Sequence, residues 1–102
     1  MTQVYAERSG SRCVLSAKGH ATGSVEVCAA VSGILYALAG YLSNVIRERY
    51  IEFYENRMEE ADVLLEFNGD DCTTAAFEMA VIGLAQIGQQ HPGFLQVEYT
   101  EE

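Results

Sequence analysis

The chain has 102 residues, 49% of them hydrophobic and 21% charged, and its 15 acidic and six basic residues give a formal net charge of −9 at pH 7. This length predicts one domain over residues 1–102 that buries its own core, and the apolar content excludes an intrinsically disordered chain. The acidic excess argues against a nucleic-acid partner, because lysine and arginine supply the affinity for phosphate backbones, and it favours a basic protein partner.

The three cysteines, Cys13, Cys28 and Cys72, are odd in number and far apart, so they do not indicate a disulfide framework. No CxxC pair suggests a metal site. The first ten residues carry acidic and polar side chains where a secretion signal needs a basic start and an apolar stretch. We therefore expect a protein of the reducing cytoplasm, with no metal and no cofactor.

The first two elements are predicted to form a β-hairpin. Residues 3–8 and 12–19 alternate apolar and polar side chains around the turn Ser-Gly-Ser at 9–11. Cys13 falls on the more apolar face of the second run, because side chains alternate across a strand. Cys13 is therefore predicted to be a packed strand residue.

A long apolar helix is predicted next, from about Val25 to Arg49. Before it, Gly23 suits an unusual backbone angle and Ser24 is a candidate N-cap. Glu26 places a carboxylate in the first turn, where it suits the helix dipole. Basic residues near Arg49 suit the other end of the helix for the same reason.

The apolar run Val27–Leu42 within this helix raises the question of a membrane span. The run is shorter than the ~20 residues that a spanning helix needs, and Ser32, Gly33 and Gly40 dilute it. We expect a buried central helix and no membrane partner.

A second pair of strands is predicted after the helix. Residues 50–56 and 61–67 are rich in aromatic and branched side chains, and they flank the charged stretch 57–60. The alternative is that the glutamate-rich residues 46–61 extend the first helix.

The end of the chain is predicted to form a helix and a last strand. A turn at 68–71 leads into a helix over 74–90, which ends before Pro92, and residues 94–99 follow as a strand. The candidate caps of this helix are Asp71, Thr73 and Thr74. The element order predicts an α/β protein of the α+β type: a two-layer sandwich with a mostly antiparallel or mixed sheet and two helices packed on one face.

His20 and Cys28 lie on either side of a short loop at the predicted junction of strand and helix. The first turn of a helix lowers the pKa of a thiol, and the backbone N–H groups around Cys28 and Ala29 are candidates for stabilising an oxyanion. A histidine at the end of the strand can act as base and then as acid. Spacing alone leaves two interpretations open, thiol catalysis and an ordinary buried cysteine with a histidine nearby by chance.

The motif itself adds information. GHA at Gly19–Ala21, followed by a short loop and VCAAVS at Val27–Ser32, resembles the ribosomal-processing cysteine protease family, Prp. The likeness covers nearly the whole chain, because the element order fits and residues 75–97 are similar to the family's second helix and last strand.

The resemblance implies a cysteine endopeptidase with Cys28 as nucleophile and His20 as general base. The residues implied to support the oxyanion or the loop are Gly19, Ala21, Gly23, Ala29 and Ser32. It also implies a cytoplasmic homodimer that removes an N-terminal extension from a ribosomal large-subunit protein, cutting after an aromatic residue. A protein or peptide substrate follows, either a basic ribosomal N-terminus or a similar cytoplasmic or phage protein.

Two departures from the family pattern keep an alternative open. Val25 replaces the family's aspartate, and Glu26, a possible charge partner, is displaced by about 100° around a helix. Only seven residues separate His20 from Cys28, whereas the family carries a longer glycine-rich loop. The alternative is a non-catalytic Prp-like relative that binds peptides or dimerises.

Other reactive or aromatic residues receive structural interpretations. Cys72 precedes the second predicted helix without a histidine near it in sequence, and His91 suits a helix cap. Tyr36 and Tyr41 are expected in the core or at dimer contacts, although an aromatic residue near the cleft would help to bind an aromatic substrate residue. A zinc site built from both histidines with Cys28 and Cys72 has no recognisable ligand spacing.

Overall fold

The computed structural model describes residues 1–19, 23–46, 48 and 51–102, with the backbone alone for 52–54. Its elements are β1 (Thr2–Ser9), β2 (Arg12–Lys18), α1 (Val25–Val45), β3 (Glu52–Glu59), β4 (Asp62–Asn68), α2 (Asp71–Gln90) and β5 (Leu95–Glu101). This is the predicted order of strands and helices.

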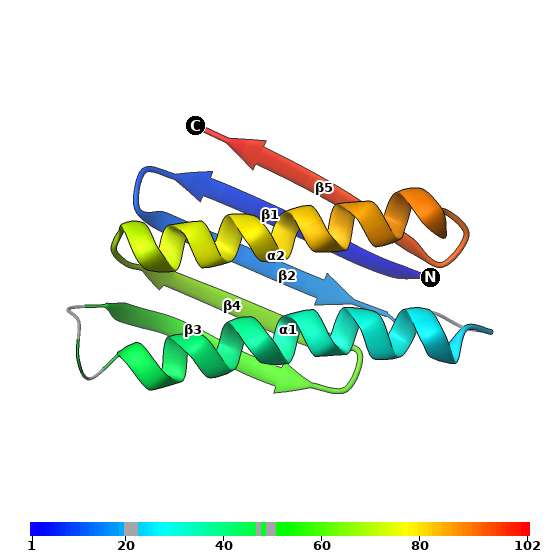
Figure 1. Cartoon of the computed structure of the whole chain (residues 1–102), viewed down its shortest axis with the longest axis horizontal. Coiled ribbons are helices and arrows are strands. Elements are labelled where there is room, and N and C mark those ends of the chain that lie inside the picture. Colours follow the sequence, from blue (N-terminus) through cyan, green and yellow to red (C-terminus); the bar gives the residue numbers. More distant parts are fainter. Residues whose placement is uncertain (20–22, 47, 49–50) are drawn as a thin grey trace.

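The strands form one mixed sheet in the order β3-β4-β2-β1-β5. Neighbouring strands are antiparallel except β1 and β5, which are parallel. This follows from the connection, because α2 carries the chain back along the sheet before β5 begins. Both helices lie side by side on one face of the sheet and run in opposite directions (Figure 1). The predicted α+β two-layer sandwich is confirmed.

The core lies between the sheet and the two helices. Cys13, Leu15 and Ala17 point into it from β2, as the alternating pattern predicted. Phe67 of β4 meets Phe77 of α2 edge-on, with ring centroids 6.2 Å apart. Such aromatic pairs add stabilisation beyond their buried area, so this contact helps to fix α2 over the sheet.

The second hairpin differs from the prediction at its turn. The charged stretch 57–60 is not a loop, because β3 continues to Glu59 and only Glu60 and Ala61 separate it from β4. β3 is an edge strand, and charged side chains are well tolerated on an edge that faces water. The alternative of a helix over 46–61 is wrong, since β3 occupies half of that range.

The end of α1 and the start of α2 also differ from the predicted positions. α1 ends at Val45, with no basic residue in its last turn, and Arg49 lies outside the described residues. α2 begins at Asp71, three residues earlier than predicted, and Asp70 is its N-cap. The Asp70 carboxylate accepts a hydrogen bond of 2.9 Å from the Thr73 backbone N–H. The predicted caps therefore lie inside the helix.

α1 has 21 residues, and by length and composition it is able to cross a membrane. The argument that this apolar segment is too short was therefore wrong. The core helix of a compact domain meets the same criteria, however, and α1 packs its buried side chains against the sheet: Val27, Val31, Leu35, Leu38, Ala39 and Leu42.

Candidate active site

The motif begins where β2 ends, at Gly19. Gly19 has φ +89°, and a Cβ atom there would lie 2.6 Å from the carbonyl oxygen of Met1. Its N–H donates to the carbonyl oxygen of Ala61 at 3.0 Å, and its own carbonyl accepts from the Thr2 hydroxyl at 3.2 Å. Gly19 is thus held between the start of β1 and the β3–β4 turn. Only glycine fits this backbone angle and close approach.

The next two motif residues, His20 and Ala21, lie outside the described residues. The chain is described again from Gly23, which has φ +89° as its predicted unusual angle requires. A Cβ atom there would lie 3.6 Å from the ring of Phe94. The roles of His20 as base and of Ala21 in the loop remain predictions.

Ser24 caps α1, as predicted, because its hydroxyl accepts a hydrogen bond of 3.2 Å from the Val27 N–H. Cys28 is the fourth residue of the helix and is half-buried. Its own N–H donates to the Ser24 carbonyl oxygen at 3.2 Å. The predicted oxyanion donor at Cys28 is therefore already used within the helix. The N–H of Ala29 is committed in the same way by the i→i−4 pattern.

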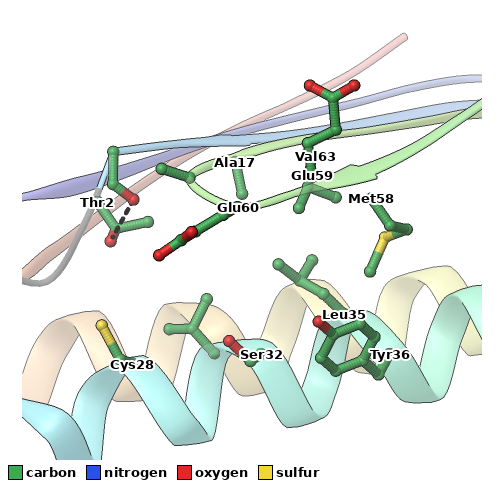
Figure 2. A pocket seen from close by; sticks show the side chains of 13 residues that line it. Thr2, Ala17, Cys28, Ser32, Leu35, Tyr36, Met58, Glu59, Glu60 and Val63 are labelled. Carbon is green, nitrogen blue, oxygen red and sulfur yellow. Dashed lines mark hydrogen bonds between the residues drawn. The ribbon is translucent and has the colours of Figure 1, made fainter.

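Cys28 lines a pocket of about 460 Å³ between α1 and the end of the sheet. In Figure 2 the Cys28 thiol points from the helix toward Thr2 across this space. The apolar part of the wall consists of Ala17, Val31, Leu35, Met58, Ala61 and Val63. The remaining lining residues are Thr2, Gly19, Ser32, Tyr36, Glu59 and Glu60. The pocket thus joins Gly19, Cys28 and Ser32 of the motif to the distant β3–β4 hairpin.

The structure separates the other predicted support residues from this pocket. Glu26, Ala29 and Gly23 are exposed, and none of them is among the described lining residues. Val25, where the resemblance to Prp implied an aspartate, is 84% exposed. Tyr36 is 65% exposed and lines the pocket, so the expectation that it lies in the core is wrong, and its role in a dimer contact stays a prediction. Tyr41 is half-buried and does not line the pocket.

Sequence reasoning missed the contribution of the second hairpin. Thr2, Glu59 and Glu60 line the pocket although they are far from the motif in sequence. The antiparallel pairing of β2 with β4 brings the β3–β4 turn beside Gly19. Alternating strand patterns indicate that a second hairpin exists, but they do not tell which of its residues face Cys28.

The remaining cysteines have different surroundings. Cys13 is fully buried in β2, and burial raises the pKa of its thiol to about 11, which opposes nucleophilic reactivity. Cys72 is exposed in the first turn of α2, and Cys28 is the fourth residue of α1. The two helices begin at opposite ends of the molecule (Figure 1). One zinc ion therefore cannot bind both Cys28 and Cys72.

Other candidate metal ligands among the described residues do not lie close together either. In the described ranges, no three histidine, cysteine or acidic side chains lie close enough to hold a metal ion. His91 is the C-cap of α2, where its N–H donates to the Ile87 carbonyl oxygen at 2.9 Å. The cap interpretation of His91 is confirmed.

The fold is shared with solved proteases. The essential ribosomal processing protease Prp from Staphylococcus aureus, in complex with a covalently linked product peptide, matches with a TM-score of 0.79 and 13% identity, over 98% of this chain and 100% of that chain. The same protease with a substrate peptide matches with a TM-score of 0.69 and 15% identity over the same shares. SMU.848 from Streptococcus mutans matches with a TM-score of 0.73 and 19% identity, over 100% of this chain and 96% of that chain.

No protein-family model matches the sequence, and no curated protein matches it significantly. The structural matches confirm, at the level of the fold, the resemblance to Prp that the motif indicated.

Proposed function

We propose that this protein is a cysteine endopeptidase of the Prp type. The observation that carries the proposal is the position of Cys28. Its thiol lies near the start of α1, in the same pocket as Gly19 of the GHA motif. The fold around this pocket is shared with a protease that has been solved with substrate and product peptides. A pocket of about 460 Å³ has room for substrate side chains.

The proposed reaction uses two side chains. The Cys28 thiolate attacks the carbonyl carbon of the scissile peptide bond, and His20, which has taken the thiol proton, gives a proton to the leaving amine. The new amino terminus departs and leaves a thioester on Cys28. Water then attacks the thioester with His20 as base, which releases the carboxylate product and restores the thiol.

The oxyanion donors need a new assignment, because the Cys28 N–H is used within α1. The first N–H groups of a helix have no acceptor in the helix. In α1 these belong to Val25, Glu26 and Val27, and Ser24 already binds that of Val27. The N–H groups of Val25 and Glu26 are the candidate donors that remain at the start of α1, toward which the Cys28 side chain leans, although neither residue is among the described residues that line the pocket.

The substrate class follows from the resemblance and from charge. We propose a cytoplasmic protein or peptide, with the basic N-terminal extension of a ribosomal protein as first candidate. The net charge of −9 supports a basic substrate, because opposite charges speed encounter. We also propose a homodimer, as the resemblance implies.

A non-catalytic peptide-binding relative is the second candidate. The exposed Val25 favours it, because the carboxylate that the family has at this position is absent and Glu26 does not line the pocket. A histidine without an orienting carboxylate is a weaker base. The pocket would then bind a peptide without cutting it.

The test is cleavage of a synthetic peptide that carries a ribosomal N-terminal extension ending in an aromatic residue, followed by mass spectrometry. We expect one cut after the aromatic residue, abolished by both Cys28→Ser and His20→Ala. Binding of the intact peptide without a cut would support the second candidate. Cleavage that survives Cys28→Ser would refute the mechanism.

A further inference from the structure

The pocket beside Cys28 has an acidic and an apolar part. Glu59 and Glu60 line the pocket from the β3–β4 hairpin, and among the described lining residues none is basic. In Figure 2 the Glu60 carboxylate points into the space between the hairpin and α1, whereas the Glu59 carboxylate points away from α1. An aromatic substrate residue would gain nothing from the Glu60 carboxylate.

Arg57 of β3 does not neutralise the Glu60 carboxylate, because it pairs with Asp62 at 3.2 Å. In the described part of the chain, Glu60 forms no ion pair with lysine or arginine. Glu60 is solvent-exposed in this structure, so its carboxylate remains available to a cation that enters the pocket.

The apolar wall suits the stem of a long cationic side chain. Leu35, Met58 and Val63 lie deeper in the pocket than the acidic rim, and all are buried or half-buried. Lysine and arginine bury their methylene stems against such surfaces while the charged head stays near water. On the opposite wall, the hydroxyls of Ser32 and Tyr36 are acceptors for the N–H groups of the head.

From these observations we propose that the pocket binds a lysine or arginine side chain of the substrate peptide, with Glu60 as the specificity-determining residue. The inference deepens the proposed function and rests on it.

Helix geometry sets the distance of this subsite from the cleaved bond. Cys28 and Ser32 are one turn apart on α1, about 6 Å along its axis. An extended peptide advances about 3.3 Å per residue. The basic residue therefore lies one or two positions from the residue whose carbonyl carbon Cys28 attacks.

Peptide binding to a Cys28→Ala variant tests the subsite apart from catalysis. The probes are fluorescein-labelled Gly-Ala-Ser-Phe-Ala-Ser-Gly peptides in which lysine replaces each residue around the phenylalanine in turn. Norleucine at the same positions retains a four-carbon stem without the charge. Fluorescence anisotropy then gives the lysine-to-norleucine affinity ratio at each position, at low and at high salt.

We expect a ratio of about ten at one position near the phenylalanine, falling at high salt because exposed charges are screened. Glu60→Gln should bring the ratio close to one, whereas Glu59→Gln should change it little, because the Glu59 carboxylate points away from α1. Glu55→Gln is the matched control, because Glu55 is exposed on the same strand and does not line the pocket. It should leave the ratio unchanged.

A ratio near one at every position, or a ratio that Glu60→Gln retains, would overturn the inference. The active chain separates the two proposals. Cleavage without any preference for lysine would support the protease and refute the subsite. A lysine preference in binding, without cleavage by the wild type, would support the subsite and refute the protease.

Discussion

Helices α1 and α2 begin with similar local sequences but have different surroundings. Each has a polar N-cap, an acidic residue in its first turn and a cysteine within its first four residues. Cys28 of α1 is half-buried and faces a pocket built by other elements, whereas Cys72 of α2 is exposed and lines no described pocket. A helix start supplies partial positive charge in both places. The pocket, and not the helix start, distinguishes the candidate nucleophile.

The largest expected effect separates the two cysteines directly. Cys28→Ser should lower kcat/KM for peptide cleavage by at least about 10³-fold, because the nucleophile is lost. Cys72→Ser should stay within about twofold of wild type, as exposed substitutions usually do. Mass-spectrometric rate measurements on both variants check this. Similar losses in the two variants would remove the distinction between the helices.

The end of β2 beside α1 should be sensitive to an added methyl group. Gly19→Ala is expected to lower the free energy of unfolding by about 3 kcal/mol, because the new Cβ meets the Met1 carbonyl oxygen at a positive φ. Gly10→Ala is the control, since Gly10 has φ +61° with nothing within 4 Å, and it should cost about 1 kcal/mol. Urea unfolding of both variants measures the difference, and equal costs would contradict the close approach at Gly19.

Cys13 differs from both helix cysteines because it is buried in the sheet. Its thiol pKa rises from 9.0 to about 11, mainly through burial, while Arg8 opposes the rise. The unfolded chain loses this proton first as pH increases, so up to about 2 kcal/mol of stability disappears between pH 9 and pH 11. Cys13→Ala should flatten this alkaline decline in urea midpoints. A slope identical to that of wild type would show that the thiol does not contribute.

The raised pKa of Tyr99, caused by burial and then by nearby Glu101, acts in the same direction. Some alkaline decline should therefore remain in Cys13→Ala, and Cys72→Ser, which leaves Cys13 in place, is the control that should retain the full decline.

The two N-caps give the smallest expected effect. Asp70→Ala should cost about 1.5 kcal/mol and Ser24→Ala about 1 kcal/mol. Asp70 binds both the N–H and the hydroxyl of Thr73, whereas the Ser24 hydroxyl accepts one bond, from Val27. Thermal or urea unfolding gives the stabilities. Only Ser24→Ala should also slow peptide cleavage, because that cap holds the helix start beside the pocket. Equal effects on cleavage would argue against this difference between the helices.

Local patterns predicted most of the elements. The alternation in residues 12–18 placed Cys13 on the buried face, and the Ser24 cap was identified from its residue type and position. The second turn was missed because Ala61 has φ 60°. Glycine or asparagine usually marks that conformation, so the sequence carries no signal for a two-residue turn after Glu59.

Features that depend on the pairing of strands far apart in the sequence could not be predicted from local sequence patterns. Nothing in residues 94–99 shows that β5 lies parallel to β1, because the partner strand is at the other end of the chain. The motif identified Cys28 as a candidate nucleophile, but Glu60 enters the pocket only through the pairing of β4 with β2. A carboxylate in a hairpin turn looks like an ordinary exposed residue until the sheet order is known.

The contact between Gly19 and the start of β1 has a practical consequence for work with this protein. Met1 lies against the backbone at the end of β2 and Thr2 lines the pocket, so an affinity tag fused before Met1 would begin beside the pocket. The C-terminus leaves from the opposite end of the sheet, where Glu102 donates to the Arg8 carbonyl oxygen (Figure 1). Tags, surface immobilisation and fusion partners therefore belong after Glu102, where they do not obstruct a peptide that enters beside Cys28.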